Sequence, residues 1–204
     1  MRFADAMVSV CRSLLTESGL SPIFAYTFSD EISIYLTELP FEGRVEKLVS
    51  VIASFASSAL TIAMDLKTPV AFDARIVPVD PGHVITYLIW RQKEAWRNHM
   101  NGYSQILLQR EGLSPVITQR NLNGLGAGKL HEICFQHGVN LAQTPAWERR
   151  GIMLYKKKKE KEGLNPITGE KTRAIRNSVV EDRDLPLFSK PEGEELIYQL
   201  LNPV

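Results

Sequence analysis

The sequence predicts an α+β fold in which helices pack on one face of an antiparallel sheet. Three patterns predict it: an apolar helical repeat at the start of the chain, a tight β-hairpin directly after it, and a second long helical repeat after the hairpin. This order is typical of the split βαβ, or ferredoxin-like, arrangement. That arrangement has a strand before its first helix, whereas the helical pattern here begins at the third residue. We therefore expect a sheet that lacks its first strand.

The first four elements each have a clear signal. Residues 3–17 carry apolar side chains at helical spacing. The runs 23–28 and 32–37 are rich in β-branched and aromatic residues, which favours two strands joined by a short turn. Residues 41–64 repeat the helical pattern, with alanines and serines that permit close packing. Together they predict helix, hairpin and helix.

The remaining elements continue the alternation of helices and strands. In chain order they are expected to be a strand over 70–80, a helix from 83 to about 110, a Gly-rich helix–turn–helix to about 138, a strand over 150–159, a turn over 163–170, a strand over 171–182 and a helix near 193–201. We expect a domain boundary at residue 110. The segment 111–204 would then be a C-terminal α/β extension of helices and a β-hairpin.

The composition is that of a soluble globular protein. The chain has 204 residues, 44% of them hydrophobic, which is enough for a sizeable core. Its 24 basic and 23 acidic residues nearly cancel, so the overall charge does not indicate a nucleic-acid partner. Only Cys11 and Cys134 are present, which fits a reducing compartment better than a disulfide framework. With no signal peptide and no apolar run near the ~20 residues of a membrane span, we expect a cytoplasmic protein.

Two adjacent acids stand at the turn of the predicted hairpin. In "FAYTFSDEISIYL" the strands are joined by Ser29, Asp30 and Glu31. Neighbouring strand residues point to opposite faces, so the two carboxylates cannot both enter the core. Acids are common at ordinary turns, and this remains one interpretation. The other is a magnesium site, since Mg²⁺ prefers carboxylate oxygens, although a two-metal centre normally needs a further acid from a neighbouring strand.

Basic side chains follow the hairpin. Arg44 and Lys47 lie three residues apart at the start of the second helix, near the positive end of its dipole. Asp73 and Arg75 share one face of the predicted strand 70–80. Cations at a helix start near a carboxylate turn would suit a triphosphate with its metal. A solvated helix face is the alternative interpretation.

Several strings in order resemble the tRNA-histidine guanylyltransferase family and its guanylyltransferase-like 3′-to-5′ polymerases. They are "FSDEISIYL", "GRVEKLVSVIASFASSAL", "AFDARIV", "YLIWRQ", "GKLHEICF" and "RRGIMLYKK", and they extend over about residues 3–160. The resemblance implies a polymerase-palm catalytic domain over 1–110. It also implies a nucleotidyltransferase that uses Mg²⁺ (two ions), takes GTP and ATP as substrates, acts on the 5′ end of tRNA and assembles as a homotetramer.

The resemblance also implies roles for individual residues. Asp30 and Glu31 would bind the metal and act in catalysis, and Ser29 would contact nucleotide phosphate. The triphosphate would be held by Arg44, Lys47 and Arg75. Contacts with tRNA are expected from Asn98, Arg149, Arg150 and Lys156.

The sequence departs from the family pattern at two places. The family's first strand, which carries another metal-binding Asp, would precede residue 1, so the metal site is expected to be incomplete in this chain. In the helix after "WRQ" the family motif His-x-Asn-Asn-x-x-Asn is replaced by "WRNHMNG". That replacement favours template-dependent repair of tRNA 5′ ends. Addition of G to tRNA-His, and a non-catalytic tRNA- or nucleotide-binding protein, remain alternatives.

A zinc site is not favoured. His131, Cys134 and His137 lie three residues apart on a predicted helix, and steps of three drift around the helix axis. No fourth ligand is evident at the spacing that zinc sites prefer.

Overall fold

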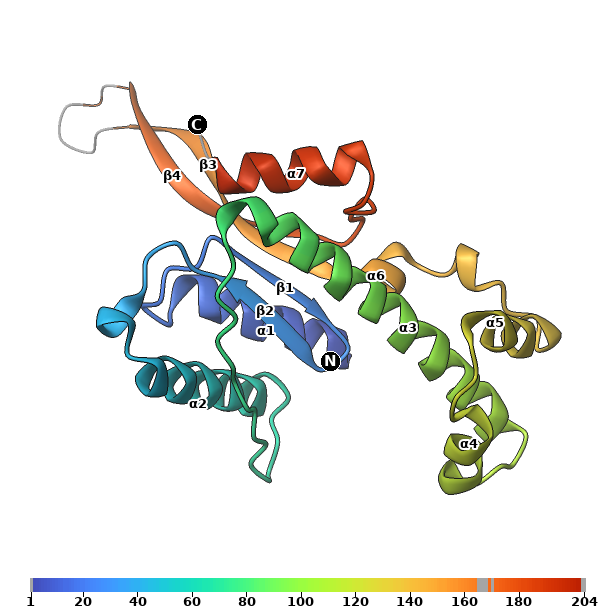
Figure 1. Ribbon diagram of the computed structural model, residues 1–204. Coiled ribbons are helices and arrows are strands. Elements are labelled where there is room, and N and C mark those ends of the chain that lie inside the picture. Colours follow the sequence, from blue (N-terminus) through green and yellow to red (C-terminus); the bar gives the residue numbers. More distant parts are fainter. Residues whose placement is uncertain (1, 165–168, 170, 203–204) are drawn as a thin grey trace. The chain divides into compact units, whose positions relative to one another are not determined.

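The computed structural model describes residues 2–164, 169 and 171–202 (Figure 1). The chain forms two compact units that interleave along the sequence. The first consists of Met1–Pro78, Ile152–Asp182 and Gln199–Val204, and the second of Val79–Gly151 and Arg183–Tyr198. These spatial units do not coincide with a boundary at residue 110. The division into a catalytic domain and an extension concerns function and stays a prediction.

A four-stranded antiparallel sheet organises the first unit. Its strand order is β2 (Glu31–Tyr35), β1 (Phe24–Phe28), β3 (Ile152–Leu164), β4 (Lys171–Asp182). The hairpin and both C-terminal strands are therefore confirmed. All five residues of β1 are buried, because a strand lies on each side of it and helix α1 packs against it. The predicted turn over 163–170 lies largely outside the described residues.

Two helices complete the core of this unit. Helix α1 (Phe3–Thr16) packs against β1 and β3, and α2 (Val45–Ala63) packs against α1. Between them lies an apolar cluster built on Ala6, Met7, Val10, Leu14, Leu20, Ala56 and Leu60. Ala56, one of the small residues of α2, is part of this cluster. The predicted α+β architecture is thus confirmed.

Helix α2 is unusually exposed for so apolar an element. By length and composition alone its 19 residues could cross a membrane, and only a small share of it is buried. Leu48, Ala56 and Leu60 are buried, whereas Ile62 is 79% exposed. The buried residues place α2 in the core of the unit, and Val51, Ile52 and Phe55 pack partly against the same cluster.

The predicted strand over 70–80 is wrong. Residues 69–80 form no ladder with any strand that the structure describes. The segment nevertheless alternates like a strand: Val70 and Phe72 pack on the core cluster, whereas Asp73 and Arg75 are exposed. The Phe72 amide donates to Ser57 Oγ at 2.9 Å instead of to a neighbouring strand.

The split βαβ arrangement explains this missing ladder. In that arrangement, two parallel strands joined by a helix leave room for one strand between them. Here β2, α2 and residues 70–77 would form such a unit, and the strand that fills its gap would precede α1. Among the described residues no strand lies beside residues 70–77, so this extended segment has no edge with which to pair.

Helices make up the second unit. They are α3 (Val84–Arg110), α4 (Pro115–Leu122), α5 (Ala127–Gln136) and α6 (Ala146–Arg150), with short 3₁₀ turns at Pro81–His83 and Leu141–Gln143. The predicted long helix and helix–turn–helix are confirmed. Met100, Leu107, Leu122, Leu130, Cys134 and Leu141 form their core. The chain closes with α7 (Pro191–Leu201), and a further 3₁₀ turn, Pro40–Gly43, precedes α2.

One glutamine attaches the segment before α7 to α3. Gln92 is only 6% exposed. Its Nε2 donates to the Pro186 carbonyl at 3.0 Å, and its Oε1 accepts from the Phe188 amide at 2.9 Å. Both ends of a buried amide are therefore satisfied, which removes the desolvation cost of burying it.

Leu14→Ala is expected to destabilise the protein by roughly 2–5 kcal/mol, because it leaves a cavity among residues that cannot fully collapse onto it. Leu14 is 1% exposed and lies in the cluster between α1 and α2. The matched control is Ile62→Ala on α2, where the side chain is 79% exposed and the change is expected to stay within about 0.5 kcal/mol. Urea denaturation measures both. Equal losses for the two variants would contradict this core.

Candidate functional site

The acidic turn lies at the tip of the β1–β2 hairpin. Phe28 pairs with Glu31, so Ser29 and Asp30 form a two-residue loop. Ser29, Asp30 and Glu31 are all exposed. Among the described residues, Asp30 has no ion-pair or hydrogen-bond partner. Its carboxylate oxygens are therefore available to a cation from solvent.

The backbone of this turn is strained at Ser29. Its φ is +51°, in the left-handed region that suits glycine best. Two-residue hairpins demand a positive φ at their first central position, and a serine there costs about 1 kcal/mol or more. Thr27 supports the turn, since its hydroxyl donates to the Glu31 carbonyl at 2.8 Å. The turn thus keeps a serine where glycine would be less strained.

Arg44 and Lys47 lie at the start of α2, as predicted. Arg44 is the N-cap residue and makes no side-chain cap, and its Nε donates to the Phe41 carbonyl at 3.2 Å. The Lys47 ammonium lies 4.8 Å from the centre of the Phe41 ring. Phe41, Glu42 and Gly43 all have positive φ. Two cations thus stand beside the positive end of a helix dipole, where an anion would be favoured.

The structure does not bring these cations next to the acidic turn. Strand β2 leads away from the turn, and its five residues span roughly 17 Å at about 3.4 Å each. Figure 1 shows α2 beginning beyond the far end of the hairpin. The sequence showed that Arg44 and Lys47 follow the second hairpin strand closely. It did not show that they lie at the end of the hairpin opposite to the acidic turn.

Arg75 lies in the extended segment after α2. It forms an ion pair with Asp73, with 3.6 Å between the guanidinium and the carboxylate, and both side chains are more than 80% exposed. The prediction that these two residues share a face holds, although the segment is not a strand. So exposed a pair contributes little stability, which leaves Arg75 available for an anion.

Strand β2 is an open edge of the sheet within the described residues. In a two-residue hairpin the closing pair is hydrogen-bonded, and bonded pairs then alternate along the ladder. Glu31, Ser33 and Tyr35 therefore direct their backbone groups toward β1. The N–H and C=O groups of Ile32 and Ile34 point outward, away from β1. The next strand of the sheet would be added here, beside the acidic turn.

The acids and histidines of the described chain do not gather into a metal centre. No three His, Cys, Asp or Glu side chains there approach closely enough to hold an ion. Asp30 and Glu31 fit the chemistry of a magnesium ligand set, since both are exposed carboxylates. They supply only part of such a set, and the open edge of β2 is where the remainder would come from.

Two of the residues predicted to contact tRNA make hydrogen bonds to backbone carbonyls of this chain. Arg149 Nε donates to the Thr144 carbonyl at 2.9 Å, and an Arg150 guanidinium nitrogen donates to the Leu185 carbonyl at 2.8 Å. Both arginines are half-buried, as is Asn98 on α3. Lys156 is half-buried on β3, where it pairs with Val179, whereas Lys157–Lys159 are exposed. The exposed lysines are thus the more accessible part of this basic stretch.

Sequence analysis missed a buried polar cluster on α3. His99, 8% exposed, has its Nε2 at 2.9 Å from Thr144 Oγ1. That hydroxyl donates its own proton to the Leu141 carbonyl at 2.7 Å, so His99 Nε2 must be the donor to Thr144. Burial, together with the nearby charges of Arg149 and His131, lowers the pKa of His99 to about 4.

A tyrosine one turn along α3 belongs to the same cluster. The Tyr103 hydroxyl donates to Glu148 at 2.6 Å, and its ring lies 4.6 Å from the His99 ring. Burial and that hydrogen bond raise the pKa of Tyr103 to about 12. The cluster fixes α6 against α3. The sequence indicated only that the 83–110 helix is polar, and it did not show which residues His99 and Tyr103 would bond.

Two family models match consecutive parts of the chain. Residues 1–80 match the model described as tRNAHis guanylyltransferase, and residues 82–187 match the Thg1 C terminal domain. The second match alone covers more than half of the chain. Both agree with the resemblance stated from the sequence.

Individual relatives agree with the family models. The chain is 30% identical over 166 residues to the probable tRNA(His) guanylyltransferase of Mus musculus. The matched region is 76% of this chain and 56% of that protein. The protein of the same name from Homo sapiens is 30% identical over 160 residues, covering 72% and 54%. The chain thus spans about half the length of these curated relatives.

Solved structures share the fold. A bacterial tRNA(His) guanylyltransferase-like protein in complex with ATP superposes with a TM-score of 0.69 at 25% identity, covering 98% of this chain and 79% of that chain. The tRNA(His) guanylyltransferase of Saccharomyces cerevisiae gives 0.62 at 22% identity, covering 74% and 72%. The second likeness shows the fold alone.

Hydrogen exchange tests the open edge of β2. In the 204-residue chain the amides of Ile32 and Ile34 are expected to exchange fast, since they point away from β1. In a chain extended upstream by a strand that pairs with β2, they should slow by at least about tenfold. The Tyr26 amide, central in the sheet, is the control and should be slow in both. Strong protection of Ile34 in the 204-residue chain would rule out a free edge.

The depressed pKa of His99 predicts a loss of stability in acid. Between pH 6.5 and about 4 the unfolded chain binds a proton that folded His99 does not, so stability rises with pH there and is lost as pH falls. Each unit of pKa difference corresponds to about 1.4 kcal/mol. Urea unfolding at pH 7 and pH 4.5 should show a smaller pH effect for His99→Gln than for the unaltered protein.

Proposed function

The chain belongs to the tRNA(His) guanylyltransferase family, and we propose that it forms the nucleotidyltransferase part of an enzyme that extends tRNA at its 5′ end in the 3′–5′ direction. The observation that carries the proposal is the exposed turn of Ser29, Asp30 and Glu31, which lies inside the matched family region. An accessible carboxylate without a partner is the feature that phosphoryl transfer with a divalent ion requires.

Asp30 and Glu31 are the proposed magnesium ligands of this chain. Two ions are expected, and the remaining ligands would come from the strand that pairs with β2. Bound there, Mg²⁺ would stabilise the negative charge that develops on the attacking and leaving oxygens. The exposed turn provides access for phosphate oxygens, and Ser29 is proposed to donate a hydrogen bond to one of them.

Nucleoside triphosphates are the proposed small substrates. Similar bacterial proteins are described in complex with GTP and with ATP. The 3′-hydroxyl of an incoming nucleotide would attack the activated 5′ phosphate of the tRNA, forming a phosphodiester bond as the activating group leaves. Both the incoming nucleotide and the activated tRNA end carry phosphate chains. Positive charge would therefore be needed at two places, from Mg²⁺ at the acidic turn and from basic side chains away from it. Arg44, Lys47 and Arg75 are proposed to hold these chains.

Repair of truncated tRNA 5′ ends on a template is the favoured reaction. The α3 segment "WRNHMNG" supports it, because it departs from the motif of enzymes that act on tRNA-His. The buried His99 and its bond to Thr144 give this segment a structural role. Addition of a single G to tRNA-His is the alternative reaction at the same site.

A non-catalytic nucleotide- or tRNA-binding protein is the second candidate function. The observation that favours it is the partial ligand set, with two adjacent acids and no third close by among the described residues. Such a protein would retain the cations at the start of α2 and lose the metal-dependent step.

The larger assembly is proposed from family resemblance. We propose a cytoplasmic homotetramer that contacts tRNA through Asn98, Arg149, Arg150 and Lys156. Each arginine gives one N–H to a backbone carbonyl, which holds its guanidinium in place. Fixed guanidinium groups lose less entropy when they bind.

Nucleotide incorporation tests the proposed function. An upstream-extended protein, Mg²⁺, labelled GTP and a 5′-truncated tRNA triphosphate should yield an extended tRNA. Asp30→Asn should reduce the rate by more than the roughly 10- to 100-fold typical of losing an outer-shell partner of a metal. Lys47→Met, which keeps the length of the stem, should slow the reaction mainly by raising the KM for the nucleotide.

The matched control is Asp65→Asn. Like the turn acids, Asp65 is exposed, but it pairs with Lys67 at 3.0 Å and has no proposed role at the site. This variant should add nucleotides at the unaltered rate. Absence of incorporation by the upstream-extended protein, with tRNA binding intact, would decide for the non-catalytic alternative.

A further inference from the structure

Helix α6 is too short to hold its own shape. It has five residues, and it carries Arg149 and Arg150, two of the residues proposed to contact tRNA. Isolated helices shorter than about 12 residues are marginal in water, because the first turn fixes several residues for one hydrogen bond. The orientation in which α6 presents its arginines is therefore set by the element that it packs against, which is α3 (Figure 1).

Two side chains one turn apart on α3 hold α6. His99 Nε2 donates at 2.9 Å to the hydroxyl of Thr144, two residues before the helix. The Tyr103 hydroxyl donates at 2.6 Å to Glu148, within the helix. Residues four apart lie on the same face of a helix, so both hydrogen bonds come from one face of α3. We call these four residues the α6 clamp.

Thr144 connects the clamp to Arg149. Its carbonyl accepts from Arg149 Nε at 2.9 Å, while its hydroxyl accepts from His99 and donates to the Leu141 carbonyl. A guanidinium is planar, so a hydrogen bond at Nε fixes the plane in which both terminal nitrogens lie. Among the described residues these two nitrogens of Arg149 have no partner. The clamp thus orients N–H groups that are left for an acceptor from outside this part of the chain.

The clamp leaves the charge of Arg149 uncompensated. The neighbouring acid, Glu148, accepts from Tyr103 instead of from Arg149. His99 is neutral at pH 7, since burial and the nearby charges of Arg149 and His131 lower its pKa to about 4. The arginine is therefore held in position without being neutralised, which suits an anionic partner such as a phosphate.

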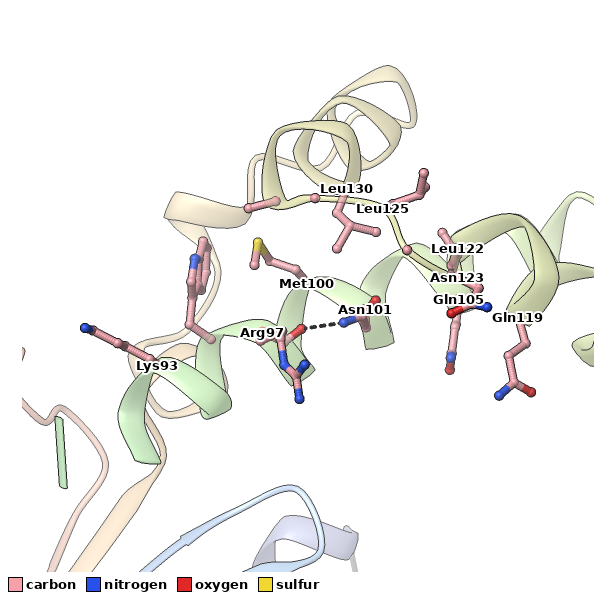
Figure 2. Close-up of a pocket in the computed structure, with 14 residues that line it drawn as sticks. Lys93, Arg97, Met100, Asn101, Gln105, Gln119, Leu122, Asn123, Leu125 and Leu130 are labelled. Atoms are coloured by element: carbon pink, nitrogen blue, oxygen red, sulfur yellow. Dashed lines mark hydrogen bonds between the residues drawn. The ribbon is translucent and has the colours of Figure 1, made fainter. Parts of the chain in front are cut away.

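The clamp is separate from the cavity of the helical unit. A pocket of about 550 Å³ lies between α3 and the α4–α5 connection (Figure 2), and neither the four clamp residues nor Arg149 line it. Figure 2 shows Met100 pointing from α3 toward that pocket, whereas the neighbouring His99 bonds Thr144. A change in the clamp therefore alters the support of Arg149 and leaves the lining of the pocket as it is.

We propose that His99, Tyr103 and Thr144 are positioning residues for tRNA binding, which act by holding the guanidinium of Arg149 in the orientation that meets a phosphate. They touch no RNA themselves. The inference rests on the proposed function in one respect, that Arg149 contacts tRNA. The gain is entropic, because a side chain that is already ordered loses less freedom when it binds.

Two variants separate the order of Arg149 from its charge. Fluorescence anisotropy of a labelled 5′-truncated tRNA with the whole chain, at about 50–200 mM salt, gives affinity and salt slope. Arg149→Met should bind about tenfold more weakly and have a salt slope shallower by about 1, because it removes a phosphate contact. Thr144→Val keeps that charge but loosens it. It should bind about two- to tenfold more weakly at an unchanged salt slope.

Conservative variants test whether the hydrogen bonds themselves matter. Thr144→Ser keeps the hydroxyl and should bind like the unaltered chain. His99→Gln keeps an N–H donor and should bind more tightly than His99→Leu, which has none. Thr118→Val is the matched control: this threonine of α4 is fully buried, and its hydroxyl has no hydrogen-bond partner in the part of the chain that the structure describes. Its tRNA affinity should be that of the unaltered chain.

A double-mutant cycle decides whether the clamp acts through Arg149. In the Arg149→Met background, Thr144→Val and Tyr103→Phe should cause no further loss of affinity, because no guanidinium is left to position. Thermal unfolding checks that each variant is folded, and if Thr144→Val is not, Tyr103→Phe carries the same comparison. Losses as large as those in the unaltered chain, or clamp variants that bind like Thr118→Val, would overturn the proposal.

Failure of the proposal is distinguishable from failure of the proposed function. If Arg149→Met loses affinity and the clamp variants do not, the tRNA contact stands and the positioning role fails. If Arg149→Met binds tRNA like the unaltered chain, the contact and the positioning role fail together. If the upstream-extended protein adds no nucleotide but the variants bind as expected, the proposed reaction fails and the positioning role stands.

Discussion

The pairing of β1 with both β2 and β3 is the constraint on which the first unit depends. A buried strand must satisfy its backbone groups on both sides. β1 does so with its hairpin partner on one side and with a strand from the distant end of the chain on the other. This central position makes β1 wholly buried and fixes the direction of the hairpin. The acidic turn is exposed because Ser29 and Asp30 lie beyond the last residue pair of this hairpin.

Local signals predicted most of the elements but not their neighbours. The hairpin, α1, α2 and the two C-terminal strands follow from periodicity and turn residues, which act over a few positions. Residues 70–80 show the limit of such signals. Alternation correctly placed Asp73 and Arg75 on one face. A ladder also needs a partner strand, and whether one is adjacent depends on the fold as a whole.

The same distinction applies to the candidate site. The pleat predicted only that Asp30 and Glu31 could not both face the core, whereas in the structure both are exposed. The separation of Arg44 and Lys47 from the turn could not follow from chain order, which gives nearness along the sequence but not at which end of a strand the next helix starts. The hydrogen bonds of Arg149 and Arg150 to backbone carbonyls could not be predicted either, because every residue carries a backbone carbonyl and the residue type does not show which one accepts.

The Gln92 side chain makes two hydrogen bonds, and these limit which residues can replace it. Glutamate has the same size, yet an ionised glutamate would set a second oxygen against the Pro186 carbonyl, and asparagine is one methylene too short to reach both acceptor and donor. The glutamine amide offers a donor and an acceptor together at this length whatever its surroundings, because it does not titrate. An asparagine or an ionised glutamate here would leave the Pro186 carbonyl or the Phe188 amide without this hydrogen bond.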